Sequence, residues 1–419
     1  MLYLFANTYC FLIKKLLFCF YNMKGIIPYF ICMFALSFAF KVRAQVKATI
    51  SFSNCIIQAK DGGYVLTGKT YPNGGDISAI YIVKLDSISN VKWTKTISGT
   101  SNEYANSIIQ AKDGSYLLVG EISGDASGVD ITIVKLDGMG NIKWTKSIGD
   151  MDNQYAYSIV QTKDGGFALT GATSFAGSEG ENIYVAKLDA MGNVKWKKSI
   201  DGPTYSEGSS IITTIDGGYA VGGYKESLTT NMHSDGIRYD FNVVKLDSAG
   251  KVQWKKIIRG AGSKSTYSMV QTKDGGYVVT GTIDSSAVNN EDVYLVKIDA
   301  KGALQWTKTV GGKFKDISNA VVQTTDGGYA IAGATKTSSK ANLSVYAIKF
   351  DASGKVVWTK ATGEQGDNEG ESIVQTRDGG YAISGYTNVN NTSNYKFYAV
   401  KLDSKGNVQW TKSIGSENH

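Results

Sequence analysis

Short apolar runs separated by turn-forming residues recur along the chain from about residue 50 to its end. One unit consists of Ser158–Thr162, Phe167–Gly171, Ile183–Asp189 and Val194–Ile200. β-Branched and aromatic residues fill these runs, and Asp-Gly or Gly-Asn pairs separate them, which is typical of strands rather than helices. The pattern therefore predicts four short β-strands in each unit.

Tryptophan occurs once in each unit and nowhere else in the chain. The seven positions are Trp93, Trp144, Trp196, Trp254, Trp306, Trp358 and Trp410. Most intervals are about 52 residues, and a period of this length indicates one supersecondary unit copied along the chain. Seven units of four strands predict an all-β fold, a seven-bladed β-propeller of antiparallel blades. An open β-solenoid is the alternative, but its coils are shorter than this period.

We expect the strand after each Asp-Gly turn to be the innermost, because it ends in glycine, as at Gly68 and Gly385. Near a crowded axis only small side chains fit. The first strand, Asn54–Ala59, is expected to pair as an outer strand with the last blade. Such pairing would close the ring and remove its open edge.

Three residue types recur in every unit and are predicted to be structural. The tryptophans are expected to be buried between sheets. Each lysine of the Lys-Leu-Asp triplets, such as Lys187, is expected to lay its stem on apolar surface and pair with a turn aspartate. The Asp-Gly pairs, such as Asp164-Gly165, predict tight hairpins in which both central residues have positive φ.

Residues 1–44 are predicted to be a signal peptide. From Met23, the expected true start, the chain has a basic residue, an apolar run over Ile26–Phe40, and a small residue, Ala44, before the expected cut. An uncleaved membrane anchor is the alternative. Residues 45–419 then form a single domain. Without the five basic residues of the leader the chain has 39 basic and 37 acidic residues, which argues against a nucleic-acid partner.

Three of the four cysteines lie in the leader, so no internal disulfide can form in the mature chain. The remaining cysteine, Cys55, is expected to be buried in the first strand. These features predict a secreted or cell-surface protein, expected to be a monomer.

The unit resembles the bacterial β-propeller repeat of secreted and cell-surface proteins. The matching segments are Gly99–Glu103, Ser107–Ala111, Asp113-Gly114, Val134–Leu136, Gly363–Glu371, Asp378–Tyr381 and Ser384-Gly385. The resemblance implies a propeller fold outside the cytoplasm and does not imply an activity.

A more distant likeness is to quinoprotein-type propeller repeats, to which Lys401–Asp403 and Trp410 are similar. Quinoprotein dehydrogenases with such repeats usually have eight blades, an adjacent cysteine pair and a calcium site near the cofactor, and the likeness would imply these features here. This chain has seven units and one mature cysteine, so no cofactor is predicted.

The sequence offers little catalytic chemistry. His233 and His419 are the only histidines, which excludes a zinc site built from several histidines or cysteines. No phosphate-binding glycine loop stands between a strand and a helix. No catalytic residue is therefore predicted, and calcium, held by loop carboxylates, is the only metal considered.

The fourth unit is six residues longer than its neighbours, and the excess falls between Glu226 and Asp240. Irregular loops on a rigid scaffold commonly carry binding residues. The candidate binding loop comprises Glu226, His233, Asp235, Arg238 and Asp240. A second candidate set lies in the connections between units and comprises Asn102, Glu103, Asp152, Asn153, Glu207, Asp367, Asn368 and Glu369. Capping of the neighbouring blade by hydrogen bonds is the alternative role for this second set.

These observations predict a non-enzymatic binding module that takes a protein or glycan partner on the face of the disc that carries the long, variable loops, the long-loop face. The alternatives are a quinone-dependent oxidoreductase or polysaccharide-active enzyme, and a structural surface module without a specific ligand. Contact with a membrane is expected only through an uncleaved leader.

Overall fold

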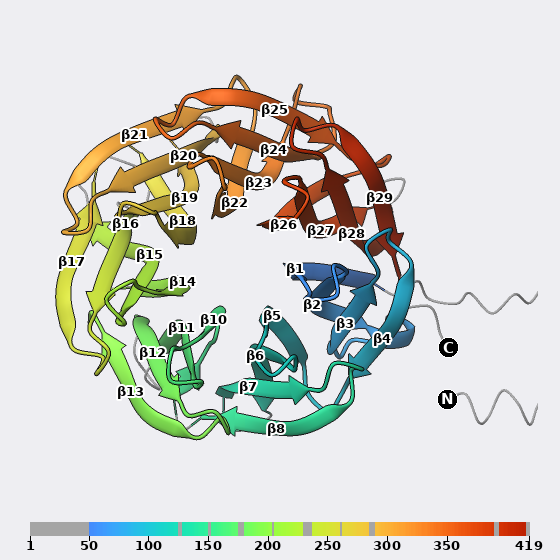
Figure 1. The fold of residues 1–419 in the computed structure, drawn as a ribbon, viewed down its shortest axis with the longest axis vertical. Helices are drawn as coiled ribbons and strands as arrows, with labels where there is room; N and C mark the ends of the chain where they lie inside the picture. Colours follow the sequence, from blue (N-terminus) through green and yellow to red (C-terminus); the bar gives the residue numbers. More distant parts are fainter. Residues whose placement is uncertain are drawn as a thin grey trace, which may run out of the picture. The chain divides into compact units, whose positions relative to one another are not determined.

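The computed structural model describes residues 50–124, 128–149, 152–174, 180–202, 205–228, 237–259, 262–284, 290–388 and 394–415. The chain divides into two units, Met1–Lys47 and Ala48–His419, and the described residues belong to the second. They form seven antiparallel sheets of four main strands, arranged as blades around one axis (Figure 1). The predicted seven-bladed β-propeller is confirmed. The predicted signal peptide and Met23 lie outside the described residues.

Each blade follows the chain from the axis to the rim (Figure 1). The inner strands are β1 (Ile50–Gln58), β5 (Glu103–Gln110), β10 (Ser158–Gln161), β14 (Ser206–Thr213), β18 (Ser263–Gln271), β22 (Asp316–Gln323) and β26 (Asn368–Gln375). The second strands are β2 (Tyr64–Tyr71), β6 (Tyr116–Gly124), β11 (Phe167–Ser174), β15 (Tyr219–Leu228), β19 (Tyr277–Asp284), β23 (Tyr329–Thr335) and β27 (Tyr381–Asn388).

The third strands are β3 (Ala79–Leu85), β7 (Gly128–Leu136), β12 (Asn182–Leu188), β16 (Ile237–Leu246), β20 (Glu291–Ile298), β24 (Ser344–Phe350) and β28 (Tyr395–Leu402). The outer strands are β4 (Val91–Ile97), β8 (Ile142–Ile148), β13 (Val194–Ile200), β17 (Val252–Ile258), β21 (Leu304–Val310), β25 (Val356–Thr362) and β29 (Val408–Ile414). Blade 3 adds the short strand β9 (Asn153–Gln154), and one 3-10 turn, η1 (Pro72–Gly74), precedes β3. Within the described ranges, no helix is long and apolar enough to cross a bilayer.

The sequence predicts the strand after the Asp-Gly turn to be innermost, and this prediction is wrong by one strand. The strand that carries the Ser-Ile-Val-Gln type of sequence, such as β10, lies nearest the axis, and the strand after the Asp-Gly turn lies second (Figure 1). Glycine is required in the second strand because the inner strand bulges against it. A Cβ on Gly68 would lie 1.9 Å from the Phe52 carbonyl oxygen, across the irregularity between Ser53 and Cys55.

The predicted closure of the ring by strand exchange is also wrong. Strand β1 pairs with β2 of its own blade, from Ile50 opposite Tyr71 to Gln58 opposite Tyr64. Blade 7 already has four strands, β26 to β29, so no place is left for a strand from the other end.

The seam between blades 7 and 1 is made by side chains. The Phe52 ring centroid lies 5.3 Å from that of Tyr386 and 4.8 Å from that of Tyr395. At the opposite end of the strand, the backbone N–H of Arg377 donates to Gln58 Oε1 over 3.0 Å. Side-chain packing at this seam therefore closes the ring, in place of the strand pairing that the sequence predicted.

The tryptophans lie between blades, as predicted, but they are half-buried because the outer strands expose one face. Trp358 meets Tyr381 of the next blade edge to face, with ring centroids 5.7 Å apart. Gly406 of the same neighbouring blade leaves room for the indole, because a Cβ there would lie 2.9 Å from it. Cys55 is half-buried as well, and burial raises the pKa of its thiol.

The Asp-Gly turns differ from the predicted hairpin. Gly62 has a φ of 86°, whereas Asp61 has no positive φ. The N–H of Gly62 donates to the Ala59 carbonyl over 2.9 Å, which makes a longer turn that ends in a glycine bulge. Asp61 Oδ1 accepts the N–H of Gly63 over 3.0 Å, so the aspartate orders the turn through its side chain.

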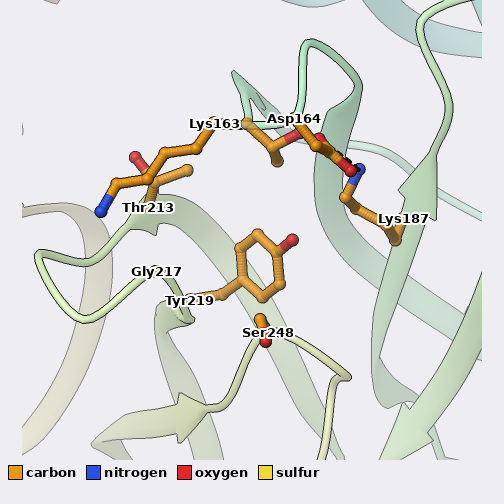
Figure 2. A pocket seen from close by; sticks show the side chains of 8 residues that line it. Lys163, Asp164, Lys187, Thr213, Gly217, Tyr219 and Ser248 are labelled. Carbon is orange, nitrogen blue, oxygen red and sulfur yellow. Dashed lines mark hydrogen bonds and ion pairs between the residues drawn. The ribbon is translucent and has the colours of Figure 1, made fainter.

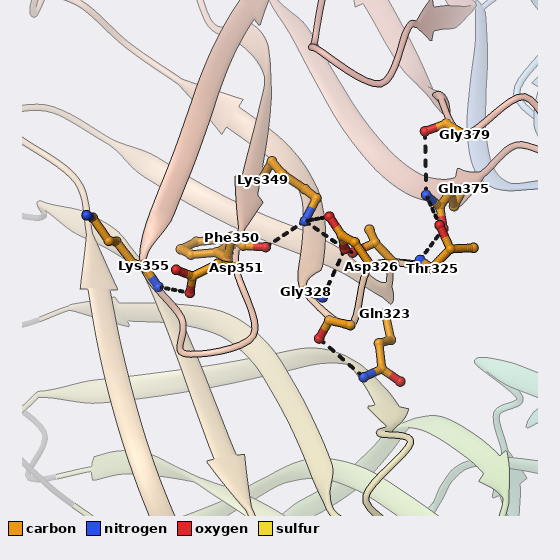
Figure 3. Close-up of polar contacts among 12 residues, drawn as sticks. Gln323, Thr325, Asp326, Gly328, Lys349, Phe350, Asp351, Lys355, Gln375 and Gly379 are labelled. Carbon is orange, nitrogen blue, oxygen red and sulfur yellow. Dashed lines mark hydrogen bonds and ion pairs between the residues drawn. The ribbon is translucent and has the colours of Figure 1, made fainter.

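The predicted lysine–aspartate pairs are confirmed in all seven blades, and Figure 3 shows the pair of blade 6. Lys349 Nζ lies 3.0 Å from Asp326 Oδ2 and donates to the Phe350 carbonyl over 2.8 Å. The lysine stem is buried and the aspartate is mostly exposed. Beside this pair, the N–H of Thr325 donates to Gln375 Oε1 of blade 7 over 2.9 Å, which joins the two blades.

Candidate functional site

Three residues of the candidate binding loop are described, and they belong to the scaffold. Arg238 and Asp240 lie in β16 and form an ion pair at 3.0 Å. Asp240 is fully buried, and its second oxygen lies 3.7 Å from the buried Lys264 ammonium of blade 5. Glu226 Oε2 accepts the N–H of Tyr205 over 3.2 Å. His233 and Asp235 lie outside the described residues.

Three residues of the second candidate set cap the neighbouring blade. Asn102 Oδ1 accepts the N–H of Ser78 over 2.8 Å, just before β3. Asn153 and Asp367 accept backbone N–H groups at the corresponding positions, Val129 at 2.9 Å and Leu343 at 2.8 Å. These bonds order the start of the third strand of the preceding blade, which is the alternative role that the sequence left open.

The remaining members of this set divide between scaffold and surface. Asn368 is buried and donates to the Gly366 carbonyl over 2.7 Å, so it holds its own loop. Glu103 has a pKa raised by burial, and its backbone N–H donates to the Ser78 carbonyl. Asp152 is half-buried just before β9. Glu207 and Glu369 instead belong to a larger cluster on the long-loop face, which is the face that carries the connections from second to third strands.

The first half of each inner strand departs from the repeat. After the bulge most units repeat the Ser-Ile-Val-Gln type of sequence, whereas the residue at the bulge and the residue two positions before it change from blade to blade. At the bulge the residues are Asn54, Asn106, Tyr157, Ser209, Tyr267, Asn319 and Glu371. Two positions before the bulge the residues are Phe52, Tyr104, Tyr155, Glu207, Ser265, Ile317 and Glu369. Variation on an otherwise constant scaffold marks these positions as candidates for binding.

Cross-strand pairing joins these positions to equally variable ones in the second strand. Tyr104 lies opposite Glu121, Glu207 opposite Tyr224, and Glu369 opposite Tyr386. Phe52 lies opposite Lys69. Blades 5 and 6 carry smaller or aliphatic pairs at these positions. We call the set Phe52, Lys69, Tyr104, Glu121, Tyr155, Tyr157, Glu207, Tyr224, Glu369 and Tyr386 the tyrosine–glutamate arc.

The arc is continuous from blade 7 to blade 2. Tyr386 donates its hydroxyl to Glu369 over 2.6 Å and packs edge to face on Phe52. Lys69 Nζ lies 5.3 Å from the Phe52 ring centroid and 5.5 Å from that of Tyr104. A cation held between two rings is stabilised by their quadrupoles, so this lysine links the two blades.

From blade 2 to blade 4 the arc combines carboxylates with stacked tyrosines. Tyr104 hydrogen-bonds Glu121, and burial raises the pKa of that carboxyl. Tyr155 stacks on Tyr157 with centroids 6.3 Å apart. Burial, then the charge of Glu207, raises the pKa of the phenol of Tyr157. Ionisable groups on three blades therefore lie close enough to influence one another.

Two carboxyl groups beside the arc have strongly raised pKa values. Burial, followed by the charge of Glu207, raises the pKa of Glu181 to about 7. Burial and the charge of Glu369 raise the pKa of Glu371 to about 8. A carboxyl group that holds its proton near neutral pH can donate a hydrogen bond as well as accept one. In the described part of the chain, no group of three or more acidic, histidine or cysteine side chains is arranged to hold a metal ion.

The sequence prediction found Glu207 and Glu369 of the arc and missed its aromatic members. Phe52, Tyr104 and Tyr155 precede the predicted first strand of their units, and Tyr386 follows a predicted second strand, so the expected strand bounds left all four in connections. The signal that could have identified them is their failure to repeat, since the inner aromatics next to each tryptophan do repeat in every unit.

A cavity of about 190 Å³ lies on the opposite, short-turn face, between blades 3 and 4 (Figure 2). Its lining includes the Lys187–Asp164 ion pair, the Tyr219 ring, and Thr213 at the end of β14. An equivalent cavity of about 400 Å³ lies between blades 7 and 1 and is lined by the corresponding Lys401 and Asp378. Because both cavities are built from the repeated turn, they are explained by the scaffold.

Comparison with protein families and curated proteins gives limited matches. Residues 238–419, less than half of the chain, match the model of a PQQ-type repeat family described as outer membrane protein assembly factor BamB. The regulatory protein FlaEY of Caulobacter vibrioides is 22% identical over 160 residues, which cover 32% of this chain and 17% of FlaEY. The match therefore spans a small part of that relative.

Solved structures show the same fold at low identity. Puromycin hydrolase aligns with a TM-score of 0.53 and 12% identity, covering 88% of this chain and 54% of the hydrolase. A mutant of that enzyme complexed with PGG gives 0.56 and 12%, over 89% and 55% of the two chains. At such identity the likeness concerns the fold alone. The chain is a seven-bladed β-propeller whose second half is built from repeats similar to those of the quinoprotein-type propellers.

Proposed function

We propose that the protein is a secreted or cell-surface binding module, without catalytic activity, that takes a protein or glycan partner on the tyrosine–glutamate arc. The observation that carries the proposal is the departure of the arc from the repeat. A scaffold that needs only packing would be expected to reuse one residue at each equivalent position, as it does for tryptophan and for the lysine–aspartate pair.

The chemistry of the arc suits a ligand with many hydroxyl groups or with basic side chains. Tyr104, Tyr155 and Tyr386 are half-buried, so each presents part of a flat amphipathic ring to a ligand. Glu207 and Glu369 hold neighbouring tyrosine hydroxyls at 2.7 and 2.6 Å, which fixes the side chains before a ligand arrives. Pre-organisation of this kind reduces the entropy that binding costs.

The location outside the cytoplasm rests on two supports. The first is the predicted leader, residues 1–44. The second is the match of residues 238–419 to a family whose description names an outer membrane assembly factor.

Binding to an array of neutral and amino-sugar glycans, and to a library of lysine-rich peptides, tests the proposal. We expect Tyr104→Ala and Tyr386→Ala each to weaken binding about ten-fold, as loss of an interface tyrosine commonly does. Tyr267→Ala is the matched control, because Tyr267 occupies the bulge of blade 5 outside the arc and is 43% exposed. Thermal unfolding of each variant separates loss of binding from loss of fold.

Two outcomes would contradict the proposal. Binding that persists in both arc variants would exclude the arc as the contact surface. Cleavage of a polysaccharide that stops in Glu181→Gln or Glu207→Gln would instead favour a two-carboxylate enzyme, for which the raised pKa of Glu181 is the supporting observation.

A further inference from the structure

The outer turns on the short-turn face, which join third to outer strands, carry a second departure from the repeat. In each turn the aspartate Oδ1 accepts the N–H of the residue two positions on, which makes the seven tip residues structurally equivalent. In chain order the tips are Ile88, Met139, Met191, Ala249, Lys301, Ser353 and Lys405. Large apolar tips therefore occur on blades 1 to 3 and nowhere else among the seven.

The three apolar tips are unusually exposed. Ile88, Met139 and Met191 are 70%, 78% and 67% exposed. On the adjacent blade 4, Ile215 of the inner turn, which joins the inner and second strands, is 67% exposed on the same face. Four large apolar side chains this exposed, on turns of four consecutive blades at one face, give that face a row of apolar contacts for a flat apolar partner.

Lysines accompany the same three blades. At the second position of the outer strand blades 1 to 3 carry Lys92, Lys143 and Lys195, all exposed. The equivalent residues of blades 4 to 7 are Gln253, Gln305, Val357 and Gln409. The inner turns of blades 1 to 3 add the exposed residues Lys60, Lys112 and Lys163.

These lysines leave the face positively charged. On blade 1, Lys60, Lys84 and Lys92 accompany only Asp61 and Asp86. Blades 2 and 3 repeat this ratio of three lysines to two aspartates. Blades 5 and 7 reach the same excess with a charged tip, Lys301 or Lys405, so only blades 1 to 3 combine this positive charge with an apolar tip.

We propose that the short-turn face of blades 1 to 3 binds the surface of a membrane that contains anionic lipids. Equivalent positions of neighbouring blades lie at the same height along the axis, so a flat partner can contact all three tips at once. The apolar tips enter the boundary between headgroups and acyl chains, and the lysines contact the lipid phosphates. A protein partner is less favoured, because protein interfaces are depleted of lysine and the tips project rather than enclose a pocket.

Membrane binding through this face would direct the opposite, long-loop face with its tyrosine–glutamate arc into solution. The inference is independent of the ligand of the arc. It also differs from the expectation that only an uncleaved leader would contact a membrane.

Flotation of the full chain with vesicles tests the proposal. Vesicles of phosphatidylcholine alone are compared with vesicles that contain about 30% phosphatidylglycerol. We expect binding to the anionic vesicles only, and its loss in about 0.5 M salt, where the attraction is screened. The variant Ile88→Ser, Met139→Ser, Met191→Ser should bind about ten-fold more weakly. The variant Lys92→Gln, Lys143→Gln, Lys195→Gln should lose the preference for anionic lipid.

Both variants use residues that other blades carry at the same positions, so the turns should fold. The matched control is Leu304→Ser with Val357→Ser, which removes two exposed apolar residues of blades 5 and 6 and should bind as the unmodified chain does. Every variant keeps the same leader, so binding through the leader would be equal in all of them. Equal flotation of the serine variant and the unmodified chain would overturn the proposal. So would an equal loss in the control, or capture of a protein partner through these tips without any vesicle binding.

Discussion

The Trp358 indole joins two blades through one aromatic edge and one glycine. Trp358 packs on Tyr381 of the next blade, while Gly406 of that blade approaches the indole face closely enough that a larger residue would have to shift. The outer strand exposes its other face, as the pattern of β25 shows. The indole therefore contributes less buried area than a core tryptophan would.

Replacement of one indole should be costly but tolerable. We expect Trp358→Ala to lower the free energy of unfolding by about 2 kcal/mol, roughly half the loss for a fully buried tryptophan, because half of its surface already faces water. Chemical denaturation monitored by circular dichroism measures this change. Val357→Ala is the control on the same strand, since Val357 is 59% exposed and should change stability by less than about 0.5 kcal/mol. A loss of about 5 kcal/mol would mean that the indole is buried as fully as the sequence predicted.

At the scale of the elements, glutamine at the end of the inner strand connects neighbouring blades. Six such glutamines accept a backbone N–H from the inner turn of the preceding blade. They are Gln58, Gln110, Gln161, Gln271, Gln323 and Gln375. Thr213 occupies this position in β14, at the joint between blades 3 and 4. The cavity of about 190 Å³ in Figure 2 is lined by Thr213 at this joint.

Restoring the glutamine should strengthen this joint. We expect Thr213→Gln to raise the free energy of unfolding by about 1 kcal/mol, because its amide can accept the Lys163 N–H as the other six do. Differential scanning calorimetry gives the change, and Thr213→Ala, which supplies no acceptor, should give no increase. A lower melting temperature for Thr213→Gln would show that the space beside Tyr219 cannot hold the longer side chain.

At the scale of the whole molecule, two groups of carboxylates oppose each other in their response to pH. The ion-paired aspartates have lowered pKa values despite some desolvation. The pKa of Asp274 is lowered to about 2 by Lys297, and that of Asp378 to about 2 by its turn threonine and Lys401. Their stabilisation is present above the ordinary value near 3.8 and is lost as pH falls toward 2. Glu181 and Glu371 have raised pKa values, so they favour folding only while they remain protonated.

Stability should therefore be greatest near about pH 5. We expect the melting temperature to fall toward pH 2, as the turn aspartates take up protons, and to fall again toward pH 8, as Glu181 and Glu371 ionise. Calorimetry across this range measures both slopes. Asp326→Asn should lower the melting temperature at pH 7 by about 1–2 °C and have no effect near pH 2, since the exposed aspartate contributes little in water. A melting temperature that is constant between pH 4 and pH 2 would show that the ion pairs do not contribute to folding.

The amino-acid sequence alone determined the number of blades, the four strands in each and the pairing of lysine with aspartate. Each of these features lies within one unit and recurs in every unit, so local pattern and period are sufficient to predict it. Only the tertiary structure decided which strand lies at the axis, how the ring closes and which side chains form the arc. Each of these depends on what the neighbouring blade places against a strand, as Tyr386 and Tyr395 do against Phe52, and contacts between residues more than three hundred positions apart leave no periodic trace in the sequence.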